Sequence, residues 1–274
     1  MALGITFIYS IVRLINWAMG SFYMLGSYLQ FILVAHVFGV DRWWLAVPVS
    51  VAVVFALGAA LEPILVRPMF AGNVERRDEY ATVVTIALLL FMTAVAGALG
   101  GPNQYSPGSN LGSVMLGPLP VSGARFAAFV VALIALAIFY AFIRWTWLGM
   151  ALRAAADSRI GVQTAGVDLR RLDQFAFGGG VALAALAGAL LAPVFLVYPT
   201  NGAMTTTKGF EIIIIGGLGS IPGALLGGLL LGVVESLGTI LLASQYQNAY
   251  GFLLVLAVLL IRPLGLFGKR LREV

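Results

Sequence analysis

Long runs of apolar residues dominate the chain and predict its secondary structure. A helix needs about 20 apolar residues to cross a hydrocarbon core of about 30 Å, and runs of this kind recur along most of the sequence. The expected membrane segments are residues 3–15, 18–39, 43–62, 80–100, 124–143, 175–197, 209–218, 222–243 and 249–263. The pattern predicts an all-α fold, a polytopic transmembrane helical bundle, in which residues 1–274 form a single transmembrane domain.

Two of these segments are short for a crossing. Arg13 and Asn16 interrupt the first run, which lacks the charged start and small-residue cleavage site of a signal peptide. We therefore expect a clipped or tilted helix that stays in the mature protein. Residues 209–218 run into three closely spaced glycines, which are typical of a half-helix or re-entrant segment. The expectation is about eight spans plus one short or re-entrant segment.

The positions of Lys and Arg predict the orientation. Of the 16 such residues, twelve lie in residues 67–77, in residues 144–171 and in the tail from Arg262 onward, which includes Lys269, Arg270 and Arg272. Short loops rich in Lys and Arg stay in the cytoplasm. If 209–218 counts as a crossing, all three regions fall on the same side. The loop at about 101–123 has no Lys or Arg and is expected outside, with the C-terminus cytoplasmic.

Composition narrows the classes of function. Hydrophobic residues make up 61% of the chain and charged residues 10%, whereas soluble domains carry about 25% charged residues. The net charge of +5 lies in loops and not along a periodic face, which favours topology control over nucleic-acid binding. With no cysteine, the chain has no disulfides, thiol nucleophiles or Cys-based metal sites, and no cofactor is expected.

The longest polar interruption is residues 151–172, "ALRAAADSRIGVQTAGVDLRRL". Asp157 is placed to cap a helix of about seven residues, and Gly166 is placed to end it. Asp168 is placed to cap the next span. The loop, at about 144–172, is therefore predicted to hold two helix ends joined by a short transverse helix.

Two interpretations of this loop remain open. In the first, it is an ordinary ordered loop held by its own Arg and Asp residues. In the second, it is a docking element that offers Ile160 and Val162 to a soluble partner, with a polar rim of Arg153, Asp157 and Arg159. A helix this short is marginal alone in water, so other contacts must hold it.

Charged residues inside the apolar runs are candidates for function, because burial of a charge there costs about 2.5–3.5 kcal/mol on insertion scales. Glu211 follows Lys208 by three positions, which predicts an ion pair on one helical turn. Glu235 either lines a permeation path or hydrogen-bonds to a neighbouring helix. Glu62, near a helix end, is expected to extend toward water. His36 is interpreted as a packing residue.

Glycine positions predict helix packing and helix breaks. Gly219, Gly223 and Gly227 recur at every fourth residue, a spacing that lets helices approach closely. Ser220 and Pro222 are typical of a helix start after a break. That helix start either faces a substrate carboxylate or is purely structural. The candidate residues of a translocation path or of helix breaks are Asn16, Gly20, Met24, Gly26, Glu211, Gly216, Gly217, Gly219 and Glu235.

Four stretches carry a resemblance to a known family. "RAAADSRIGVQTAGVD" (153–168) resembles the cytoplasmic ATPase-coupling loop of ABC importer permeases. "IVRLINWAMGSFYMLGSYL" (11–29), "LEPILVRPMF" (61–70) and "GFEIIIIGGLGSIPGALLGGLLLGVVES" (209–236) are similar, in that order, to the permeases of branched-chain amino acid ABC importers. The likeness is to the H-type subunit and covers nearly all of the chain.

The resemblance implies a function and a set of partners. The subunit would form half of a translocation pathway in a bacterial inner (plasma) membrane, beside a second, M-type permease subunit. It would receive a branched-chain or related amino acid from a periplasmic substrate-binding protein and dock ABC ATPase subunits. The implied ATPase-coupling residues are Arg153, Ala155, Asp157, Arg159, Ile160, Gly161, Val162, Gly166 and Asp168.

The chain departs from the family pattern in two places. Met19 and Ser21 stand where family members often carry His and Glu, which bears on the identity of the substrate. The chain also begins within the usual first span, which predicts either a misassigned start codon or a true variant.

The residues themselves argue against an ATPase within this chain. No G-x-x-x-x-G-K-[ST] motif occurs, and "GLFGKR" (265–270) lacks its spacing and its hydroxyl. ATP hydrolysis is therefore expected in a separate subunit. The alternative is a stand-alone secondary transporter or channel in which Glu211 and Glu235 couple ions. A membrane-embedded enzyme is a third possibility, for which the chain shows no cluster of polar residues.

Overall fold

The computed structural model describes residues 1–70, 74–101, 103–108, 112–116 and 119–268. Its longer helices are α1 (Ala2–Val12), α2 (Met19–Leu33), α3 (Trp43–Leu65), α4 (Arg77–Gly100), α5 (Gly123–Trp145), α6 (Trp147–Asp157), α8 (Leu169–Leu191), α9 (Asn201–Gly216), α10 (Ile221–Leu241) and α11 (Gln247–Ile261). The shorter ones are α7 (Arg159–Thr164), η1 (Val34–Phe38), η2 (Val40–Arg42), η3 (Arg67–Phe70) and η4 (Ser244–Tyr246). The predicted all-α helical bundle is confirmed.

Within the described residues, 7 helical segments are long and apolar enough to cross a membrane: 19–38, 40–65, 77–100, 123–145, 169–191, 221–241 and 244–261. The expected number of about eight full spans is too high, because α1 has 11 residues. It ends at Val12, and the next residue, Arg13, has a φ of 60° in the left-handed region.

The segment predicted at 209–218 is longer than expected. Helix α9 begins at Asn201 and has 16 residues, about 24 Å at 1.5 Å per residue. Its first half is polar, but Thr206 Oγ1 donates to the Gly202 carbonyl inside the helix at 2.8 Å. Because this hydroxyl has a hydrogen-bond partner within its own helix, polar residues can form the first half of α9. The apolar pattern of the sequence therefore did not indicate this half.

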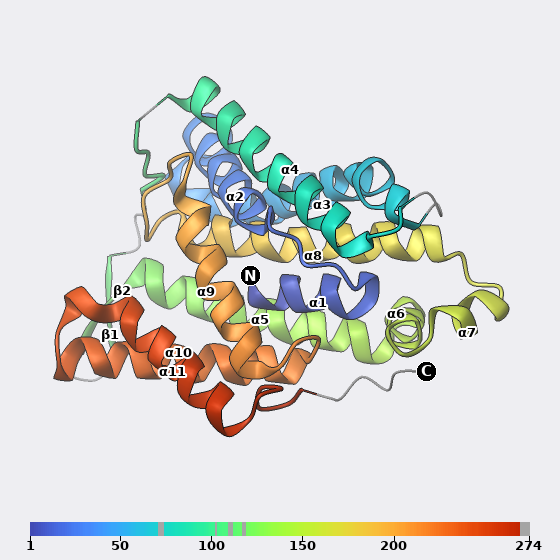
Figure 1. Cartoon of the computed structure of the whole chain (residues 1–274). Helices are drawn as coiled ribbons and strands as arrows, with labels where there is room; N and C mark the ends of the chain where they lie inside the picture. The colour runs from blue at the N-terminus through green and yellow to red at the C-terminus, as the bar shows by residue number, and fades with distance from the viewer. Residues whose placement is uncertain (71–73, 102, 109–111, 117–118, 269–274) are drawn as a thin grey trace.

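Helix α8 lies between α3 and α1 in Figure 1 and also packs against α2. Its small residues allow these approaches. At Gly180 a side chain would meet Ile8 and the Gly4 carbonyl of α1, and at Gly188 it would meet the Tyr23 carbonyl of α2. Phe177 of α8 meets Phe22 of α2 with ring centroids 6.3 Å apart. The core therefore surrounds α8 and α1.

The connections gather at two ends of the bundle. In Figure 1 the end of α3, α6 and α7 lie at one end, and the β1–β2 hairpin lies at the other. Two of the three predicted clusters of positive charge, 67–77 and 144–171, thus share one end. In the third cluster, Lys269, Arg270 and Arg272 lie outside the described residues.

The loop at 101–123 holds secondary structure that the sequence did not predict. Strand β1 (Ser113–Leu116) pairs antiparallel with β2 (Leu119–Ser122), and Ser113 lies opposite Ser122. Tyr105 forms a further bridge to Val197, with hydrogen bonds of 2.9 and 2.8 Å in the two directions. This bridge ties the loop to the segment that joins α8 to α9.

Candidate functional site

The 144–172 loop contains more helix than predicted. Thr146 caps α6 by accepting a hydrogen bond from the Gly149 amide at 3.0 Å, so α6 is a separate helix of 11 residues and not an extension of a span. Leu152 and Ala155 are buried, whereas Arg153 and Asp157 are exposed. Helix α6 therefore lies with one apolar face against the bundle.

Helix α7 is the short helix that the sequence predicted, with a different cap. Ser158 accepts from the Gly161 amide at 3.1 Å and is the N-cap; Asp157 is the last residue of α6, so its predicted capping role is wrong. Gly166, with φ of 81°, follows the end of the helix, as predicted. Asp168 accepts from the Arg170 amide at 2.9 Å and caps α8, as predicted.

The two aliphatic residues of α7 face opposite ways. Ile160 is 78% exposed, but Val162 is only 5% exposed and belongs to the core. Residues two apart on a helix are separated by about 200° because 3.6 residues make one turn. Val162 therefore holds α7 in place, and the prediction that it faces a partner is wrong.

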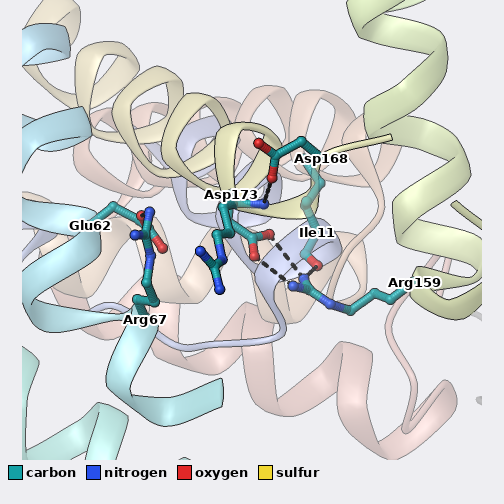
Figure 2. A network of polar contacts seen from close by, with 7 residues as sticks. Ile11, Glu62, Arg67, Arg159, Asp168 and Asp173 are labelled. Carbon is teal, nitrogen blue, oxygen red and sulfur yellow. Dashed lines mark hydrogen bonds and ion pairs between the residues drawn. The ribbon is translucent and has the colours of Figure 1, made fainter. Parts of the chain in front are cut away.

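Arg159 also points inward, so its predicted place on a polar rim is wrong. Figure 2 shows its guanidinium between Asp173 of α8 and the Ile11 carbonyl of α1. Nη1 donates to Asp173 Oδ1 and to the Ile11 carbonyl, each at 3.0 Å, and Nη2 donates to Asp173 Oδ2 at 2.6 Å. The guanidinium also lies over the Phe70 ring, 4.6 Å from its centroid.

Two further polar contacts surround this group. Arg13 Nη2 donates to the Ala156 carbonyl at 3.1 Å and so links the end of α1 to α6. Glu62 lies 3.7 Å from Arg67 Nη2. Glu62 is 1% exposed, so the expectation that it extends toward water is wrong. The positive charge of Arg67, and not contact with water, compensates for the burial of this carboxylate.

A second polar cluster lies between α9, α10 and α11. Lys208 pairs with Glu211 at 3.5 Å, as predicted, and forms a second ion pair with Glu235. Gln247 Nε2 donates to the other Glu235 oxygen at 3.4 Å. Glu235 therefore hydrogen-bonds to neighbouring helices, which is one of its two predicted roles. In this cluster the ammonium group of Lys208 lies close to the carboxylates of both Glu211 and Glu235.

The predicted helix breaks are partly confirmed. Gly216 ends α9, and Gly217 and Gly219 have φ of 96° and 80° in the turn before α10. Ser220 caps α10 through the Gly223 amide at 3.1 Å, with Pro222 in the first turn, as predicted.

Near the N-terminus the break covers residues 13–18. Asn16 is buried there and accepts from the Ala18 amide at 2.9 Å. Gly20, Met24 and Gly26 lie inside α2, so the two glycines do not form part of a break. A side chain at Gly20 would meet Gly202 of α9, and one at Gly26 would meet Ala185 of α8. They are packing positions.

The partners of Arg159 are residues that the sequence did not reveal. Asp173 and the Ile11 carbonyl are 14 and 148 positions away from it. A signal for Asp173 is present in "LRRLDQF", where an acidic residue falls on the first turns of a span and is costly to bury alone. No local pattern indicates a contact with α1.

No group of three or more His, Cys, Asp or Glu side chains is placed to bind a metal ion within the part of the chain that the structure describes. The polar groups instead join helices to one another.

Comparison with known proteins gives the family. Residues 1–262 match the family described as the permease component of branched-chain amino acid transport systems. The chain belongs to this family. The permease is the transmembrane component of an ABC transport system, in which a separate ATPase hydrolyses ATP.

Several curated relatives resemble the permease over nearly its whole length. "High-affinity branched-chain amino acid transport system permease protein LivH" of Escherichia coli K12 is 31% identical, over 98% of this chain and 90% of the relative. BraD of Pseudomonas aeruginosa is 32% identical over the same shares. A probable LivH of Methanocaldococcus jannaschii is 30% identical over 98% and 87%. No solved structure matches the permease significantly.

Proposed function

We propose that this chain forms half of the translocation pathway of an ABC importer for branched-chain or related amino acids. The names of its relatives, which are permeases of branched-chain amino acid transport systems, support this substrate class. Its partners would be a second, related permease subunit, a periplasmic substrate-binding protein and cytoplasmic ABC ATPase subunits. Residues 1–274 would act as one transmembrane domain.

The proposed orientation places α6, α7 and the C-terminus in the cytoplasm of a bacterium. Positive residues at the α3–α4 connection and in the 144–171 segment lie at this end of the bundle, and short loops with such charges stay on the cytoplasmic side. The hairpin end would then face the periplasm and receive substrate.

The ATPase would dock on α7, and one observation carries this part of the proposal. Ile160 is 78% exposed beside the exposed Asp157, while Val162 and Arg159 hold the same helix against the bundle. A fixed helix that presents an aliphatic side chain to the cytoplasm is suited to fill a pocket on a soluble partner. The alternative, a stand-alone secondary transporter, gives no reason for this exposed side chain.

The test is to replace Ile160 by Asp and to measure how much ATPase co-purifies with the permease. Burial of one aliphatic side chain contributes about 1.5–3 kcal/mol, so association is expected to weaken about tenfold or more. Arg76→Asp is the control, because it places a carboxylate at another exposed site at the same end of the bundle. Equal ATPase recovery with both variants would contradict docking on α7.

A further inference from the structure

We propose that Arg159 transmits the movement of α7 to α1 and α8, and so couples ATP hydrolysis to opening of the pathway. This inference rests on the proposed docking of an ATPase on α7. It assigns Arg159 a positioning role and not a contact with ATP or with the transported solute.

The side chain of Arg159 joins four elements. The guanidinium belongs to α7, pairs with Asp173 of α8, donates to the Ile11 carbonyl of α1 and lies over Phe70 of η3. Helix α1 is distant from α7 in sequence, and the hydrogen bond from Arg159 to the Ile11 carbonyl connects the two. The hydrogen bond from Arg13 to the Ala156 carbonyl connects the end of α1 to the neighbouring α6. A displacement of α7 therefore reaches α1 directly.

The contact between Arg159 and Asp173 is stiff. A guanidinium that meets a carboxylate with two parallel hydrogen bonds holds both the distance and the angle between its partners. The Arg159 side chain is 27% exposed and the Asp173 side chain 7%, so water replaces these bonds poorly. The Ile11 carbonyl lies in the last turn of α1, where the helix dipole also favours a cation.

Helix α1 also contacts the turn between α9 and α10. Gly219 in that turn packs on Tyr9 and Ser10 of α1, within 4 Å of the position that its Cβ would occupy. Gly217 and Gly219 adopt left-handed φ values that few other residues accept. Movement of α1 would therefore displace the turn that sets the angle between α9 and α10.

The experiment compares variants of the complete transporter, with both permease subunits, the ATPase and the binding protein, in proteoliposomes. Arg159→Lys keeps the positive charge and loses the paired hydrogen bonds. We expect it to retain the ATPase within about twofold and to lower the solute transported per ATP hydrolysed by about tenfold, the size of effect that loss of one charge-assisted hydrogen bond gives. Asp173→Asn, which nearly preserves shape, should give the same change.

Two further variants make the comparison specific. Arg171→Lys is the matched control, because Arg171 pairs with Asp168 at 3.4 Å on the surface with side chains 88% and 54% exposed, and it should leave the ratio unchanged. The exchanged pair Arg159→Asp with Asp173→Arg restores a link between α7 and α8 and should recover part of the ratio.

An unchanged ratio of transport to hydrolysis in Arg159→Lys and Asp173→Asn would overturn the inference. So would loss of the ATPase from these variants in proportion to the loss of transport, because Arg159 would then only shape the docking helix. Failure of the wild-type permease to retain any ATPase would instead overturn the proposed docking itself. If Arg159→Lys does not insert, Asp173→Asn decides the question.

Discussion

At the scale of single residues, the permease stabilises buried charges by pairing them across helices. Lys208 of α9 forms ion pairs with two carboxylates, Glu211 on its own helix and Glu235 on α10. Neither oxygen of Glu211 has a hydrogen-bond partner, so its ion pair with Lys208 is its main compensation for burial. Removal of the cation would leave two buried carboxylates close together.

Lys208→Met should therefore lower the free energy of unfolding by about 3–5 kcal/mol, the usual cost of breaking a buried ion pair from one side. Unfolding by denaturant in detergent micelles would measure the change. Arg171→Met, which removes a cation from an exposed pair, should change stability little, because surface pairs contribute about 0–1 kcal/mol. Equal stability of Lys208→Met and the wild type would show that Lys208 does not stabilise the two carboxylates.

Residue-level features differed in how far the sequence revealed them. Gly166 and the Asp168 cap follow from local backbone chemistry and were predicted correctly. The burial of Val162 and Arg159 depends on what α7 packs against, and the contact from Arg159 to Ile11 spans 148 positions. Local patterns contain no information about such a contact, so the sequence placed both residues on the wrong face.

At the scale of elements, close approach of helices through small residues organises the bundle. At Gly188 of α8, an added Cβ would meet the backbone of Tyr23 and Ser27 in α2. Backbone atoms cannot move aside as a flexible side chain can, so the two helices would have to separate.

Gly188→Ala should lower the free energy of unfolding by about 1–3 kcal/mol, as overpacking commonly does. The change would be measured by heating the permease in detergent and recording how much of it stays soluble at each temperature. Gly232→Ala in α10 is the matched control, because an added Cβ there meets nothing within 4 Å. Alanine favours a helix by up to about 1 kcal/mol relative to glycine, so this variant should be unchanged or slightly more stable. Similar losses in both variants would contradict the packing account.

The elements were predictable where bilayer length imposes a strong constraint. The predicted segments at 43–62, 124–143 and 222–243 match α3, α5 and α10 to within three residues at each end. The span predicted at 175–197 begins at Leu169, because its polar first turns lengthen the helix past the apolar run. Helix α6 was missed because its apolar face covers only part of an otherwise polar stretch.

At the scale of the whole molecule, the permease has features suited to transmitting movement, but it has no site of its own for ATP hydrolysis. It contains no nucleotide-binding motif, and its family consists of permease components. Contacts run continuously from α6 and α7 at one end of the bundle, through α1, to the α9–α10 turn. We propose that a separate ATPase supplies the force that acts on these contacts.

Uptake of radiolabelled leucine into proteoliposomes tests that claim most directly. We expect leucine to accumulate when the permease is reconstituted with its partner permease, ATPase and binding protein and when ATP is supplied on the ATPase side. We expect no accumulation by this chain alone, with or without a proton or sodium gradient. Sustained accumulation by the chain alone, driven by either gradient, would contradict the account.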